Sequence, residues 1–234
     1  MNAAPIVAIL AVLATTPSPS PSPTASEAPL REIGRVHVTT PLCKTLATHA
    51  VVAADLALED DRKIVFTVGT LRSVDFDKSI ITKTRGTREL VRQFVALRAG
   101  AVQGEAEMKK FREALKEVTN DEQRAALEKF ANALDGALYR QKKLAEDLGR
   151  YIAWLDAQGE PMTDQQRADI EKNIYMNQSN PNVRHNPFGD YNMVPETITH
   201  SAKRAADELV IRATLIDQDE DTAAERIDPA FKAC

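Results

Sequence analysis

The sequence predicts an all-α protein, an antiparallel bundle of four to five helices built around a long helical hairpin over about 87–118 and 120–157. Two observations support this fold class. Apolar or small residues recur at alternating steps of three and four along both halves of the hairpin, and such positions share one face of an α-helix. The composition is 27% charged and only 5% aromatic, which is typical of a helical domain. The first series comprises Leu90, Phe94, Leu97, Ala101, Gly104, Met108, Phe111, Leu115 and Val118, and the second comprises Leu127, Phe130, Leu134, Ala137, Gln141, Leu144, Leu148, Tyr151 and Leu155.

The hairpin is expected to turn near Thr119, between the two series. Thr119 is followed three residues later by Glu122, which is the spacing of a capping box at the start of a helix. Folding the chain there predicts a narrow waist at Gly100, Gly104 and Gly136. Each interior glycine costs a helix about 1 kcal/mol relative to alanine, so a close approach of backbones is the expected compensation. The alternative is one continuous helix through residue 119, as in an extended coiled coil.

Chain length and charge limit the function classes. One helical-bundle domain over 35–234 is the simplest division of the chain. The formal net charge of −4 provides no basic footprint of the kind that nucleic-acid binding requires. We therefore expect no nucleic-acid partner.

The first residues are typical of an export signal. Residues 3–13 form an apolar run that leads into the small-residue cleavage pattern Val12-Leu13-Ala14. The run is shorter than the roughly 20 residues that a membrane-spanning helix needs. We expect a signal peptide over 1–14; no Lys or Arg precedes the run, so either the signal is weakly charged or the true start lies upstream. The alternative is an apolar first helix of the fold.

A Pro/Ser-rich disordered spacer is expected over 15–34, because its repeated prolines favour an extended, solvated backbone. The mature chain is then expected to be secreted or periplasmic, without a transmembrane span.

The first helix of the domain is expected to begin at Thr40-Pro41, where threonine can cap and proline fits the first helical position. It should reach Glu59 and continue as one helix to about Val74. The alternative is a break before a short strand at Ile64–Val68, where β-branched residues cluster. Residues 75–86 then form a connection, with Thr87 as the cap of the second helix.

The second half of the chain is expected to contain two more helices. A capping box at Thr163 begins a short helix that includes Ile174, and an irregular loop over 177–194 follows. The last long helix starts at Pro195 and ends at an acidic break over 217–221, before a final turn over 222–227.

The two cysteines, Cys43 and Cys234, are expected to form a disulfide that fastens the tail to the bundle, because an exported protein meets an oxidising compartment. Two unpaired thiols or an intermolecular link are the alternatives.

No catalytic constellation appears in the sequence, so we expect a protein that is not an enzyme and needs no cofactor. Glu196 and His200 are four apart on a predicted helix, and with Asp207 or with His185 from the preceding loop they are candidate metal ligands. The competing interpretation is a carboxylate favoured at a helix start and an exposed histidine. His49 is interpreted as a hydrogen-bonded core histidine.

Gln141 falls on the apolar seam of the third helix. It is interpreted as a polar residue that sets the register of the bundle rather than as a site.

Residues 162–167, Met-Thr-Asp-Gln-Gln-Arg, are similar to the Leu-Thr-x-x-Gln motif of the small helical periplasmic chaperones and metal-resistance sensors of the Spy and CpxP type, with methionine in place of leucine. Residues 118–124 echo the motif loosely. The resemblance covers six residues, and it implies an exported helical protein that binds unfolded chains.

The sequence as a whole predicts a non-catalytic binding, interaction or structural module with a protein or cell-envelope partner. A helical protein that binds a metal or small ligand, and a chaperone-like protein, are the alternatives. The oligomeric state stays open.

Overall fold

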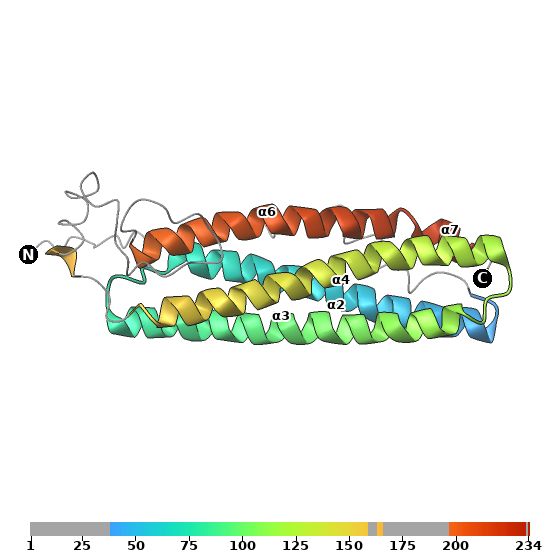
Figure 1. Cartoon of the computed structure of the whole chain (residues 1–234), viewed down its shortest axis with the longest axis horizontal. Helices are drawn as coiled ribbons and strands as arrows, with labels where there is room; N and C mark the ends of the chain where they lie inside the picture. The colour runs from blue at the N-terminus through green and yellow to red at the C-terminus, as the bar shows by residue number, and fades with distance from the viewer. Residues whose placement is uncertain (1–37, 159–162, 166–196, 233) are drawn as a thin grey trace, which may run out of the picture.

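The structure is a computed structural model, and it describes residues 38–158, 163–165, 197–232 and 234. Its described part is an all-α bundle of long helices (Figure 1). None of the described helices is long and apolar enough to cross a membrane. The elements are α2 (Pro41–Ser73), α3 (Ile80–Leu115), α4 (Asp121–Asp156), α6 (Ile198–Ala224) and the short α7 (Ile227–Phe231).

Successive helices run antiparallel and lie side by side, so that α2 packs on α3, α3 on α4, and α4 on α6, while α6 closes the square against α2 (Figure 1). The predicted hairpin is confirmed, because α3 ends at Leu115 and α4 begins at Asp121 after a turn. Asn120, rather than Thr119, caps α4, and its side chain accepts a hydrogen bond from the Gln123 amide.

The first helix is continuous from Pro41 to Ser73, as expected, and the segment over 64–68 is helical rather than a strand. The predicted start of α3 was wrong. The helix begins at Ile80, not after Thr87, because Ser79 caps it by accepting from the Thr82 amide. Position 86 requires glycine, because a Cβ there would lie only 2.7 Å from the ring of Phe76, which occupies the space beside the helix.

The acidic break expected over 217–221 was also wrong, because α6 runs without interruption to Ala224. Asp219 pairs with Arg140 of α4 at 2.7 Å, and Glu220 is buried against its neighbours, so tertiary contacts hold the acidic residues in the helix. The final turn, expected over 222–227, lies later in the chain as α7 (Ile227–Phe231), whose Phe231 packs edge-on against Phe130.

The glycines predicted at the waist lie at three different contacts. A Cβ at Gly104 would clash with Leu138 of α4, inside the hairpin. Gly100 instead faces a side chain of α2, and Gly136 faces Asp219 of α6. Small residues therefore mark approaches between several pairs of helices.

A disulfide joins Cys43, in the first turn of α2, to Cys234, and their Cα atoms lie 5.4 Å apart. Thr39 adds a backbone and a side-chain hydrogen bond to the carbonyl of Cys234. The expected signal peptide over 1–14, the spacer over 15–34 and the loop over 177–194 lie outside the described residues. So do most of the short helix that was expected from Thr163 and half of the motif over 162–167.

Candidate metal centre

The apolar core of the bundle is divided by a layer of polar side chains. One apolar cluster, at the disulfide end, includes Leu58 and Leu138. The other, at the opposite end, includes Ile64 and Leu144. Between these positions lie five polar residues that we call the polar belt: Asp60 and Asp61 on α2, Gln141 on α4, and Asp217 and Glu220 on α6.

Helical geometry explains why these residues turn inward. Asp217 and Glu220 are three apart on α6, so they share one face. Gln141 follows Leu134 and Leu138 at helical spacing and therefore enters the core with them. Asp60, Gln141 and Glu220 of the polar belt are buried, whereas Asp61 and Asp217 are partly exposed.

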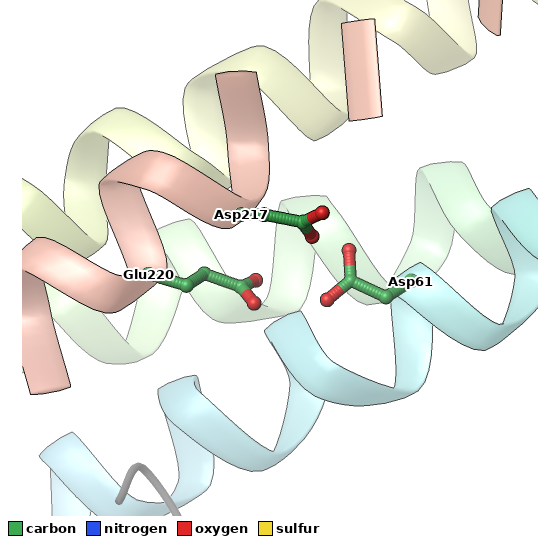
Figure 2. A group of neighbouring side chains, drawn as sticks. All are labelled: Asp61, Asp217 and Glu220. Atoms are coloured by element: carbon green, nitrogen blue, oxygen red, sulfur yellow. The ribbon is translucent and has the colours of Figure 1, made fainter. Parts of the chain in front are cut away.

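Three carboxylates of the polar belt converge on one point. Oxygen atoms of Asp61, Asp217 and Glu220 all lie within 4.8 Å of one another. Figure 2 shows Asp217 and Asp61 directed toward each other across the space between α6 and α2, with Glu220 entering from the next turn of α6. Asp61 and Asp217 are half-buried whereas Glu220 has no exposed surface, so the cluster lies inside the bundle with its outer edge open to water.

Gln141 approaches the cluster from the third helix. Its Nε2 donates to the backbone carbonyl of Ala57 at 2.9 Å, and it also lies 3.3 Å from Asp61 Oδ1 and 3.4 Å from Glu220 Oε1. The other amide atom, Oε1, is buried without a hydrogen-bond partner, and so is Glu220 Oε2. Gln141 and Glu220 therefore each have one buried oxygen without a hydrogen-bond partner, which native interiors rarely contain.

The electrostatics of the cluster disfavour a third negative charge. Burial, followed by the negative charge and hydrogen bond of Asp61 and the charges of Asp217 and Asp221, raises the pKa of Glu220 from 4.5 to about 10. Burial and the charge of Asp221 also raise the pKa of Asp217. Without a cation, Glu220 is therefore protonated at neutral pH, because an ionised carboxylate in this position is costly.

Asp60 is buried against α3 rather than in the space between α2 and α6. Its Oδ1 accepts a hydrogen bond from Lys63 Nζ at 2.8 Å, and its Oδ2 is buried without a partner against Gly100 of α3. Burial raises the pKa of Asp60 from 3.8 to about 7, although Lys63 opposes the increase. Asp60 is thus a neighbour of the cluster but not a member of it.

The donor atoms of the cluster define the kind of cation that fits. All three candidate ligands are carboxylates, and Gln141 can offer an amide oxygen if its side chain flips. Hard cations such as Ca²⁺, Mg²⁺ and Mn²⁺ prefer oxygen ligands, whereas zinc and copper sites usually include His or Cys. Ca²⁺ binds oxygen ligands at about 2.3–2.6 Å in flexible geometry, whereas Mg²⁺ requires a near-ideal octahedron at about 2.0–2.1 Å, so three carboxylates from two helices suit Ca²⁺ better.

Those metal ligands proposed from the sequence that the structure describes lie away from this site. Glu196 and His185 lie outside the described residues, and His200 is exposed in the first turn of α6. Asp207 pairs with Arg72 at 2.6 Å on the surface. His49 Nδ1 lies 2.8 Å from Glu107 Oε2, in a partly buried pair far from the polar belt along α2.

The sequence interpretation missed Asp61, Asp217 and Glu220. The acidic run on α6 was interpreted as a helix break, and Asp61 lies in an acidic run that was considered only as a possible break before a strand. One signal was present, because Gln141 interrupts an otherwise apolar or small seam. Comparison with known proteins gives no match: no protein-family model, no curated sequence and no solved structure is similar to this chain at a significant level.

Proposed function

We propose that this chain is an exported, non-catalytic binding protein that holds a divalent cation, with calcium favoured, in the polar belt of its bundle. The single observation that carries the proposal is Glu220, a fully buried carboxyl group with one unpartnered oxygen, facing two further carboxylates. Burying a carboxylate costs several kcal/mol unless the charge is neutralised. A divalent cation among three carboxylates supplies that neutralisation and uses the oxygen that the protein leaves unpartnered.

The position of the cluster gives the cation a structural effect. Asp61 belongs to α2 while Asp217 and Glu220 belong to α6, so one cation ties the first and last long helices of the described bundle together. Because Asp61 and Asp217 are half-buried, a cation can enter from solvent without unfolding the bundle. Binding to the folded state alone raises the free energy of unfolding.

Export is supported by the disulfide. The Cys43–Cys234 bond closes a loop that spans 191 residue positions. Such bonds form and persist in oxidising environments, such as the periplasm or the cell exterior. Extracellular calcium sites commonly bind with dissociation constants of about 0.1–1 mM. We therefore expect an affinity in that range rather than the tighter affinity of a cytosolic buffer.

The test is thermal melting and calorimetric titration of the chelator-stripped, disulfide-bonded protein with calcium, magnesium, manganese or zinc chloride. Calcium at about one hundred times its dissociation constant should add about 2.7 kcal/mol to the free energy of unfolding. For a domain of this size, this increase should raise the melting temperature by about 5–10 °C. We expect magnesium and zinc to give smaller shifts.

Two variants make the test specific. Glu220→Gln resembles the protonated side chain and removes a ligand charge, so it should fold and lose most of the calcium-induced shift. Asp207→Asn changes an exposed carboxylate on the same helix and should retain the shift. A wild-type protein that melts at the same temperature with and without calcium and manganese, or a Glu220→Gln variant with the full shift, would overturn the proposal.

A further inference from the structure

The outer face of α3 carries a regular line of exposed residues. Ile81, Thr84, Val91, Val95 and Val102 lie on it, with Arg88 and Arg98 at the two remaining positions, and the steps between successive positions alternate between three and four. All seven side chains are exposed, and Ile81 and Val95 are 77% and 56% exposed. We call these seven residues the α3 seam.

The spacing of the α3 seam is that of a helix-packing surface. Alternating steps of three and four keep side chains in one straight stripe, which is the pattern that a partner helix packs against. The outer face of a surface helix is ordinarily polar, yet four of the seven seam positions are Ile or Val. The stripe is about 32 Å long, since its 21 residue steps each advance about 1.5 Å.

Among the described helices, none covers this stripe. α3 packs on α2 and α4 through its inner face, and Figure 1 shows it along one edge of the bundle. At the start of α3 the stripe runs into a groove of about 1040 Å³, which the last turn of α2 borders. Ile81, Thr84 and Arg88 of the seam belong to the groove lining. The surface therefore offers a long contact line with a hollow at one end.

The charges along the seam are positive. Arg88 and Arg98 lie within it, and Arg85 and Arg92 flank it on the next exposed positions. Arg92 pairs with Glu89 of its own helix, whereas no carboxylate of the described residues forms an ion pair with Arg85, Arg88 or Arg98. Two α3 seams placed against each other would bring arginines together, which disfavours a second copy as the occupant.

We propose that the α3 seam docks an acidic amphipathic helix of a partner protein. The apolar residues of that helix pack on Val91, Val95 and Val102, and its flanking carboxylates pair with Arg88 and Arg98. A narrow stripe with charges on both sides suits a helix better than a lipid surface, because helices that lie on membranes present a broad apolar face. This docking is independent of the cation in the polar belt, which lies inside the bundle.

The test uses two synthetic amphipathic helices with leucine at the a and d positions, one with glutamate and the other with lysine at the e and g positions. Fluorescence anisotropy with the full mature protein should show binding of the glutamate peptide, and little or none of the lysine peptide. Binding of the glutamate peptide should weaken as salt is raised, because its ion pairs are exposed. Equal binding of both peptides, or of neither, would overturn the proposal.

Matched variants locate the surface. Val95→Glu places a carboxylate in the middle of the seam without disturbing the core, and should weaken binding of the glutamate peptide at least tenfold. Val210→Glu makes the same change on the exposed face of α6 and should leave binding unchanged. Peptide binding unaffected by Val95→Glu contradicts the proposal. So does stronger binding to phosphatidylglycerol vesicles than to the peptide, or a wild-type dimer that Val95→Glu dissociates.

Discussion

Gly100 of α3 provides the space that Asp60 of α2 occupies. A Cβ at Gly100 would clash with Asp60 Oδ1 and would lie 2.8 Å from Asp60 Cγ, so the buried carboxyl group fits only because this position has no side chain. Burial of Asp60 in the polar belt therefore depends on a glycine at the facing position of α3.

Gly100→Ala should destabilise the protein, although alanine favours a helix by about 1 kcal/mol over glycine. The added methyl group forces Asp60 out of its pocket, and overpacking of this kind typically costs about 1–3 kcal/mol. Gly69→Ala is the matched control, because nothing lies within 4 Å of a Cβ there, and it should stabilise the protein by about 0.5–1 kcal/mol. Urea unfolding measures both variants. Equal stabilisation by the two substitutions would show that Gly100 is not a packing requirement.

Loss of the disulfide should lower stability more than any single surface change. In the chain-entropy model a crosslink between positions 191 apart contributes about 5 kcal/mol, and measured effects are usually about 2–4 kcal/mol. We expect the double variant Cys43→Ser, Cys234→Ser to unfold at a lower urea concentration. Its free energy of unfolding should be about 2–4 kcal/mol below that of the wild type. A reducing agent should shift the wild-type curve to that of the variant and leave the variant unchanged. A wild-type curve that reductant does not move would contradict the prediction.

Much of the fold can be predicted from the sequence, because the buried face of a helix requires apolar residues at regular steps of three and four. The hairpin and the first helix were predicted from apolar steps of three and four. The start of α3 was not predicted correctly, because the buried face of its first turns includes Lys83 and Thr87, which are polar residues. Lys83 is buried because its Nζ reaches the carbonyl of Asp156, a contact that only the assembled bundle provides.

The candidate site was harder to predict than the fold for a related reason. A carboxylate at a buried position cannot be distinguished by type from one on the surface, and Asp217 and Glu220 lie in a run of acidic residues. What places them together is the pairing of α6 with α2, which joins positions more than 150 residues apart. Gln141 was visible on the seam but was interpreted as a register residue, because its partners on the other helices were unknown.

The stability of the cation-free protein should fall as pH rises. Glu220 has its pKa raised from 4.5 to about 10, so the folded protein holds a proton that the unfolded chain releases. The resulting stabilisation is complete below pH 4.5, declines as pH rises above it, and is lost once pH has passed about 10. The raised pKa of Asp60 has the same effect on stability, which declines between pH 3.8 and about pH 7 as this group ionises. Above pH 7 the decline therefore reports mainly on the α6 carboxylates, and it reaches at most about 1.4 kcal/mol per pH unit for each proton.

Glu220→Gln tests this assignment. The glutamine cannot ionise, so the free energy of unfolding of the variant should depend less on pH between 7 and about 9 than that of the wild type. Urea unfolding in the presence of a chelator at several pH values gives the two slopes. Identical slopes would mean that Glu220 is already ionised in the folded protein.

The start of α6 depends on a residue far away in the sequence. Asp77, in the loop between α2 and α3, is buried and accepts hydrogen bonds from the backbone amides of Ile198 at 3.1 Å and Thr199 at 2.7 Å. Thr197 caps only the amide of His200, so Asp77 satisfies two of the remaining donors of the first turn.

Asp77→Ala should therefore cost about 1–3 kcal/mol, because it leaves buried amides without an acceptor and removes a negative charge from the positive end of the helix. Asp77→Asn keeps one acceptor oxygen and should lose less. Asp207→Ala, which removes an exposed ion pair on the same helix, should change stability by at most about 1 kcal/mol. Hydrogen exchange should accelerate in the first turn of α6 in Asp77→Ala and remain slow there in Asp207→Ala. Unchanged exchange in Asp77→Ala would show that water replaces the aspartate at little cost.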